Sequence, residues 1–336
     1  MRHADNAGLT LSRYGQAMHQ GEMTELSPEA VEQVLREELA HGDVAIASAR
    51  PILRHLLVSE EHALFSDEVV ARIRGMLLDI ARQLLEAQAV AAEARDRVAF
   101  VAARDDALAA RLCGQEAFLA HAHALALEAQ LLDRLQARSG IDPVLSPLVQ
   151  ELAAGSQAGV AGLAMNVLAA QARFVQYHRR MELPLRDLPG DLFHKSLLAL
   201  REQAGADDEP AAAAERRLRG EYQEAAGRLA LIARLVTGMG SRALRALAID
   251  HAGLSIFATA LAMASGQDRD LAILSLNGRQ FARLALSLRA AGLAPPAVAA
   301  QFAYLHPEVE LPEGFELVRA DNAAALLTAH PATAAL

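Results

Sequence analysis

A long stretch without proline, from Pro51 to Pro143, constrains the fold of this chain more than any other feature of its sequence. Proline breaks or kinks helices, so a stretch of this length can hold long ones. Apolar residues within it recur every three or four positions, a spacing that places their side chains on one helical face. The clearest series is Val69, Ile73, Met76, Ile80 and Leu84. We expect two long helices here, over 67–103 and 105–138.

The amino-acid composition also favours helices. Hydrophobic residues, mainly Ala and Leu, make up 53% of the 336-residue chain, whereas aromatic residues make up 4% and Trp is absent. Ala and Leu are strong helix formers, while β-branched and aromatic residues favour strands. The sequence therefore predicts an all-α fold, with a long-helix antiparallel bundle followed by a compact array of shorter helices.

Turn-forming and capping residues divide the chain into five predicted parts. The expected order is a flexible N-terminal arm (1–26), a long-helix bundle domain (27–202), a linker (203–214), a short-helix, repeat-like domain (215–305) and a tail (306–336). The linker is predicted from the acidic sequence QAGADDEPAAAA, which contains Gly and Pro and lacks large apolar residues.

Individual helices are predicted from the same signals. Ser27 and Pro28 are typical of a helix start, and we expect that helix to be interrupted at 41–43. A helix over 156–182 has an apolar stripe on which Gln171 and His178 also fall. Glycines are expected to end the later helices. These are predicted over 211–236, 241–250, 254–264, 268–276, 279–291 and 295–305, with a short one near 320–329.

Charge is distributed unevenly along the chain, which has a formal net charge of −9. Residues 211–305 contain eleven arginines and six acidic residues, whereas residues 1–210 and the tail are acidic. A basic region of this kind can bind an anionic partner. The candidate residues are Arg242, Arg245, Arg279, Arg283 and Arg289. Two alternatives stay open: the acidic parts of the chain dock onto this region, or the arginines are solvated outer faces of amphipathic helices.

The sequence lacks the motifs of several common kinds of site. It contains no P-loop, GxGxxG, GxSxG or HExxH. His121 and His123 are two positions apart, whereas two ligands on one helix need a spacing of three or four. Cys113, the only cysteine, has no identifiable His and acid partners and is typical of a small apolar residue. We expect no catalytic residue, no cofactor and no bound metal.

His194 is a candidate for covalent chemistry, as a phosphoacceptor. It lies just inside a predicted helix start, where the helix dipole favours an anion, and beside Lys195, the only lysine. Helical phosphotransfer bundles place such a lysine three residues after the histidine, on the same face. Lys195 is instead adjacent and points about 100° away. An ordinary surface histidine is the alternative.

The C-terminal region carries a family resemblance. Residues Leu254–Leu293 read LSIFATALAMASGQDRDLAILSLNGRQFARLALSLRAAGL. This order of helix, Gly stop, short helix, Asn-Gly turn and apolar helix resembles an uncharacterised family of alphaproteobacterial domains of unknown function with helical-repeat character. The resemblance implies a bacterial cytoplasmic protein with an all-α fold. It brings no known enzyme activity and no catalytic residues.

These observations lead to one functional expectation and two alternatives. We expect a non-enzymatic helical protein that acts in protein–protein interaction, as a regulator or scaffold. The alternatives are a histidine-phosphotransfer or signalling component acting through His194, and nucleic-acid binding by 211–305. The latter is disfavoured because that region lacks dense basic runs and interleaved aromatics. We expect a protein partner, allow a homodimer through 67–138, and expect a cytoplasmic location without a membrane span.

Overall fold

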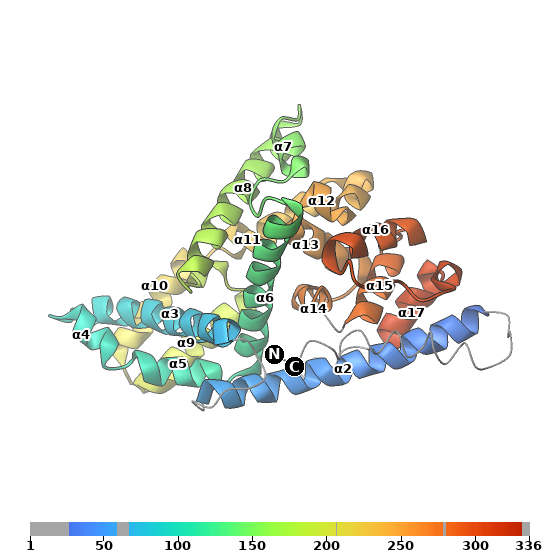
Figure 1. Cartoon of the computed structure of the whole chain (residues 1–336). Helices are drawn as coiled ribbons and strands as arrows, with labels where there is room; N and C mark the ends of the chain where they lie inside the picture. The colour runs from blue at the N-terminus through green and yellow to red at the C-terminus, as the bar shows by residue number, and fades with distance from the viewer. Residues whose placement is uncertain (1–26, 59–66, 206, 278–279, 331–336) are drawn as a thin grey trace. The chain divides into compact units, whose positions relative to one another are not determined.

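The computed structural model describes residues 27–58, 67–205, 207–277 and 280–330 (Figure 1). These residues form helices and contain no strand, which confirms the predicted all-α fold. The α-helices are α2 (Pro28–Val58), α3 (Asp67–Ala91), α4 (Arg97–Ala102), α5 (Asp105–Cys113), α6 (Glu116–Ser139), α7 (Pro147–Ala153), α8 (Ala158–Arg179), α9 (Gly190–Ala204), α10 (Glu209–Glu221), α11 (Arg228–Gly238), α12 (Ile249–Ala252), α13 (Leu254–Ser265), α14 (Arg269–Ser275), α15 (Phe281–Ala290), α16 (Pro295–Leu305) and α17 (Ala320–Ala329). The 3₁₀-helices are η1 (Leu185–Asp187), η2 (Glu224–Ala226), η3 (Gly240–Leu247) and η4 (Phe315–Leu317).

The chain divides into two compact units, and the first combines segments from both ends of the sequence. Of the described residues, unit 1 contains 27–46 and 261–330, and unit 2 contains 47–260. The predicted linker, 203–214, lies inside unit 2, where Asp208 caps α10 by accepting a hydrogen bond from the backbone N–H of Ala211 at 2.7 Å. The structure therefore divides the chain at other places than the sequence-based boundaries.

Unit 2 is built around α6. Every residue of the run 121–129 is buried, because α6 packs against α3 and α8 on different sides. Helix α3 also packs against α5, α9 and α10, and α8 packs against α7 and α11. The predicted stripe on α8 is confirmed: Val167, Gln171, Phe174 and His178 are all buried.

The prediction of two long helices over 67–103 and 105–138 is wrong. The first helix ends at Ala91, because Glu93 adopts a left-handed conformation (φ 50°) and Asp96 then starts α4 by accepting a hydrogen bond from the N–H of Ala99. A second break separates α5 from α6 at 114–115. The turn at 92–96 contains neither Pro nor Gly, so no strong stop signal for the helix is present there.

The helix predicted over 211–236 is also divided. It consists of α10, η2 and α11, and the chain turns between them at 222–227. The later predictions agree better with the structure: α16 covers Pro295–Leu305 and α17 covers Ala320–Ala329. The arm predicted over 1–26 lies outside the described residues.

In unit 1 the most buried helix is α15, whose residues 282–288 are all buried, and α17 packs against it. The predicted interruption at 41–43 is wrong, because α2 continues through it. Gly42 serves close packing instead. The side chain of Gln280 donates a hydrogen bond to the Gly42 carbonyl at 2.8 Å, and its amide occupies the space that a Cβ at Gly42 would fill.

Candidate functional site

A groove of about 880 Å³ lies in unit 2, between α3, α4, the segment after α8, α9 and α10. We call it the α3–α10 groove. Its lining residues are Asp79, Arg82, Gln83, Glu86, Ala87, Val98, Val101, Ala102, Asp105, Tyr177, Glu182, Pro184, Leu185, Arg186, Phe193, Arg217, Leu218, Glu221 and Tyr222. They come from seven helical elements and from the residues that follow α8 and α10, so the sequence order alone does not bring them together.

Two side chains of α3 fix the segment that follows α8. Asp79 accepts a hydrogen bond from the N–H of Leu183 at 2.9 Å. Gln83 accepts one from the N–H of Leu185 at 3.0 Å and donates one to the Leu183 carbonyl at 3.0 Å. These bonds satisfy backbone groups that no helix satisfies, and they hold Pro184 and Leu185 in the groove.

A stacked aromatic pair forms another part of the lining. The rings of Phe193 and Tyr222 are almost parallel, with centroids 3.9 Å apart, and the Tyr222 hydroxyl donates a hydrogen bond to the Leu188 carbonyl at 2.7 Å. Burial raises the pKa of Tyr222 to about 12, and the nearby acids Glu224 and Asp191 add to the rise. The hydroxyl therefore stays protonated at neutral pH and acts as a structural donor.

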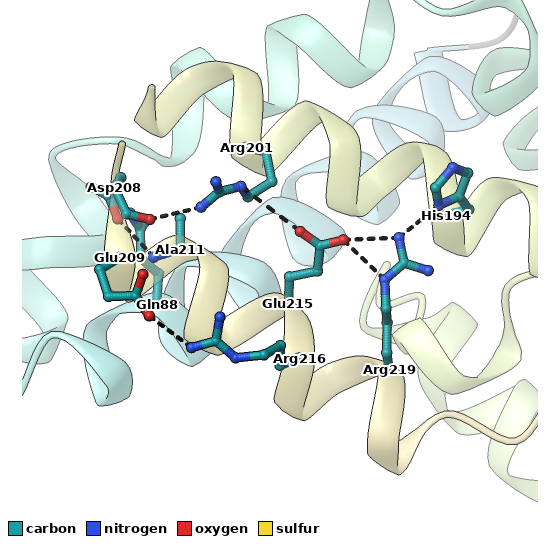
Figure 2. Close-up of polar contacts among 9 residues, drawn as sticks. All are labelled: Gln88, His194, Arg201, Asp208, Glu209, Ala211, Glu215, Arg216 and Arg219. Carbon is teal, nitrogen blue, oxygen red and sulfur yellow. Dashed lines mark hydrogen bonds and ion pairs between the residues drawn. The ribbon is translucent and has the colours of Figure 1, made fainter. Parts of the chain in front are cut away.

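An ionic network holds α10 against α9 (Figure 2). Glu215 of α10 lies between Arg201, at 3.8 Å, and Arg219, at 2.9 Å. Arg201 also donates a hydrogen bond to the Asp208 carbonyl at 2.7 Å. The network therefore fixes α9, which places Phe193 in the groove, against α10, which places Leu218 there.

Helix α4 supplies an apolar wall that the described residues leave uncovered. It has no buried residue, although its sequence is RVAFVA, and Val98 is 80% exposed. Val98, Val101 and Ala102 all line the groove. A short apolar helix exposed in this way is typical of a surface that another molecule covers.

Acidic groups outnumber basic ones in the lining, five to three. Burial raises the pKa of the Asp79 carboxyl above its ordinary value, and the carboxylate of Glu182 adds to the rise. The two carboxylates therefore repel each other, which makes this part of the lining favourable for a cation.

A second cluster, fully buried, lies in the interior of unit 2. The guanidinium of Arg228 donates to both carboxylate oxygens of Glu128, at 2.8 and 2.9 Å, and to the side-chain oxygen of Gln171 at 3.1 Å. Its other side lies over the ring of Phe174, 3.5 Å from the centroid. Ser255 donates a further hydrogen bond to Glu128 at 2.7 Å. This cluster joins α6, α8, α11 and α13, and we interpret it as structural.

His178 adjoins this cluster. Its ring lies edge-on to Phe174, with centroids 4.3 Å apart, and neither ring nitrogen has a hydrogen-bond partner within the described residues. Burial lowers its pKa to about 3, and the charge of Arg228 contributes. The imidazole is therefore neutral at physiological pH.

The four candidate arginines that the structure describes differ in their surroundings. Arg283 is 1% exposed and pairs with Asp43, and half-buried Arg289 donates two hydrogen bonds to the Val318 carbonyl. Arg245 is exposed and donates to Glu151 at 2.6 Å, while Arg242 is exposed. Arg242 and Arg245 belong to unit 2 and the other two to unit 1. Arg279 lies outside the described residues.

His194 is exposed on α9, and Arg219 lies 2.8 Å from its Nδ1 (Figure 2). Arginine can only donate, so Nδ1 accepts and the neutral ring carries its proton on Nε2. The lone pair of Nδ1 therefore accepts from Arg219, and Nε2 carries the proton. A phosphoryl transfer to His194 would first require Arg219 to leave.

The other singled-out residues show no reactive arrangement. His121 and His123 are buried in α6, and burial lowers the pKa of His123 to about 4. Cys113 is half-buried, and burial raises the pKa of its thiol, which disfavours the reactive thiolate. Within the described residues, no three or more His, Cys, Asp or Glu side chains lie together so as to hold a metal ion.

Among the described helices, α8 is long and apolar enough to cross a membrane by length and composition, and 28% of its most apolar window is buried. Its buried face carries Gln171 and His178, which belong to the interior of unit 2.

Comparisons of this chain with protein-family models, curated proteins and solved structures find no match.

Proposed function

We propose that this chain is a protein-interaction protein, and that unit 2 binds a segment of a partner protein in the α3–α10 groove. The observation that carries the proposal is α4. This helix presents Val98 and Val101 to the groove with no residue of its own buried. Burying one such side chain contributes roughly 1.5–3 kcal/mol, so a partner that covers this wall gains affinity.

The shape and chemistry of the groove favour a polypeptide over a small metabolite. Small-molecule sites enclose most of their ligand and present a few converging polar groups. Here the wall at Val98 and the acids Glu86 and Glu221 are exposed, and Arg82 is paired with Asp105 at 2.8 Å. A longer ligand that lies along the groove can cover these exposed residues, whereas a small one cannot.

Site-specific photo-cross-linking in the source cells tests the proposal. p-Benzoylphenylalanine replaces Val98 in one strain and Leu244 in another, since both side chains are exposed in unit 2 and Leu244 lies outside the groove. We expect a protein that cross-links at position 98 and not at 244. Its purified form should bind the wild-type chain.

Calorimetry with that purified partner then measures the contribution of the apolar wall. The double variant Val98→Ser/Val101→Ser should weaken binding by about tenfold or more, because it removes apolar surface from the contact. Leu244→Ser should leave the affinity within about twofold, as expected for a surface change outside the contact. Identical cross-links from both positions, or an affinity indifferent to the double variant, would contradict the proposal.

A further inference from the structure

We propose that the segment bound by the α3–α10 groove is a basic amphipathic helix. This inference rests on the proposed function and adds the chemistry of the partner. Three observations carry it: the pairing of the groove's own arginines, the carboxylates left over, and the helical surroundings of the apolar wall.

The three arginines in the lining are already engaged. Arg82 pairs with Asp105 at 2.8 Å, and Arg217 lies 3.6 Å from Glu221. Arg186 donates a hydrogen bond to the Tyr177 hydroxyl at 2.7 Å. An anionic ligand would have to break these contacts to reach a guanidinium.

Because Glu86 also lies 4.0 Å from Arg97, only two of the five acids in the lining, Asp79 and Glu182, lack an ion-pair partner within the described residues. Glu182 is half-buried and forms no ion pair within the described part of the chain, and its charge raises the pKa of Asp79. Asp79 itself receives hydrogen bonds from Leu183 N and Gln83, at 2.9 and 2.7 Å. A Lys or Arg of a partner placed between Asp79 and Glu182 would relieve the repulsion between them.

The groove is bordered by helices, and the described residues offer no sheet edge to which an extended peptide could add. A partner therefore has no strand to pair with among the described residues. The mode of recognition that fits is a helix that lies in an apolar groove. Such a helix presents apolar residues at positions i, i+3, i+4 and i+7. These would face Val98, Val101 and Leu218, with a basic residue beside Asp79 and Glu182.

Three synthetic peptides of equal length test the inference. All carry leucines at helical spacing, and the remaining positions are Lys in the first, Gln in the second and Glu in the third. Fluorescence anisotropy of labelled peptides with the full chain gives the affinities. We expect the Lys peptide to bind most tightly, and Val98→Ser/Val101→Ser to weaken its binding.

Glu182→Gln is the decisive variant, and Glu116→Gln is its matched control, because Glu116 is exposed on α6 outside the groove. Both remove one negative charge from a chain of net charge −9, so a general attraction would respond equally to both. Glu182→Gln should weaken Lys-peptide binding by about fivefold, the largest change expected for one partly exposed ion pair. Glu116→Gln should leave it within about twofold.

The outcomes separate the two proposals. If the Gln peptide binds as tightly as the Lys peptide, or if Glu182→Gln and Glu116→Gln act alike, the basic character of the partner is refuted. The apolar groove would still be supported if the double valine variant weakens every peptide. If no peptide depends on Val98 and Val101, both proposals are refuted.

Discussion

At the scale of single residues, the interior of unit 2 depends on polar groups that are buried together. Arg228 is enclosed by Glu128, Gln171 and the ring of Phe174, so its charge and most of its donors are satisfied without water. Buried pairs of this kind contribute little net stability, because desolvation offsets their attraction. Removing one partner is costly, since it leaves the other charge buried and unpaired.

Because His178 and His123 are buried, we expect the folded protein to lose stability in acid. Their pKa values are lowered to about 3 and about 4, chiefly by burial, from an ordinary value of 6.5. Below pH 6.5 the unfolded chain therefore takes up protons that the folded chain does not. Each of these histidines should lower the free energy of unfolding by about 1.4 kcal/mol per pH unit as the pH falls from 6.5 toward its folded pKa. Above pH 6.5 neither contributes.

Urea unfolding of wild type and His178→Phe at pH 7, 6 and 5 measures this dependence. The variant keeps an aromatic ring beside Phe174 and removes the titration, so its stability should fall less steeply below pH 6.5. The difference at pH 7 serves as the reference for any change in packing. Parallel pH dependences for the two proteins would show that His178 takes up a proton in the folded state, contrary to the prediction.

Some members of these buried clusters could be predicted from the sequence, and others could not. The helical spacing in 156–182 placed Gln171 and His178 on the buried stripe, and the structure confirms that position. It could not pair Arg228 with Glu128, because the two lie 100 residues apart and only tertiary packing makes them neighbours. For the same reason the sequence could not show that Arg283 is buried, because its partner Asp43 lies 240 residues away.

At the scale of helices, glycine has two structural roles that the sequence alone does not distinguish: it ends a helix, or it allows close packing within one. Gly140 ends α6 in a left-handed conformation (φ 67°), as glycine commonly does. Gly42 and Gly75 instead lie inside helices, where they allow close approach of another segment. The interruption predicted at 41–43 is wrong because Gly42 allows close packing and does not end the helix. The unpredicted turn at 92–96 shows the converse, because Glu93 takes the left-handed conformation without being glycine.

Gly75 should be intolerant of a methyl group. A Cβ there would lie 2.5 Å from the Cβ of Met181, which begins the segment held by Asp79 and Gln83. Gly75→Ala should therefore lower the free energy of unfolding by more than about 1 kcal/mol, although alanine is the better helix former by a similar amount.

Gly162→Ala is the matched control, because Gly162 lies within α8 with nothing within 4 Å of an added Cβ. It should stabilise the protein by about 0.5–1 kcal/mol. Thermal unfolding of both variants measures the contrast. Equal stabilisation by the two substitutions would show that the segment at Met181 moves aside freely, and that α3 does not fix this part of the groove.

At the scale of the whole chain, the domain boundaries could not be predicted from sequence order. A linear reading assigns consecutive residues to one domain, whereas unit 1 combines 27–46 with 261–330. Contacts that join these segments are specific: Asp43 pairs with Arg283, and Asn322 donates a hydrogen bond to Glu32. The fold class was predictable because it depends on local helix propensity, which every segment carries in its own sequence.

Each unit has its own buried arginine, and this leads to a prediction about how the chain unfolds. Asp43→Asn leaves Arg283 without its carboxylate in unit 1, and Arg228→Met leaves Glu128 without its guanidinium in unit 2. Each change should cost roughly 3–5 kcal/mol, the range for a buried ion pair that loses one partner. If the two cores unfold independently, the loss should stay within the unit that carries the substitution.

Hydrogen exchange followed by mass spectrometry measures this for each helix. Asp43→Asn should accelerate exchange in α15 and α17 and leave α6 and α8 unchanged, and Arg228→Met should do the reverse. Helices α2 and α13 are excluded from the comparison, because each contributes residues to both units. Glu37→Gln, an exposed change on α2, should alter neither unit. Faster exchange in both units from either variant would show that the chain unfolds as one cooperative body.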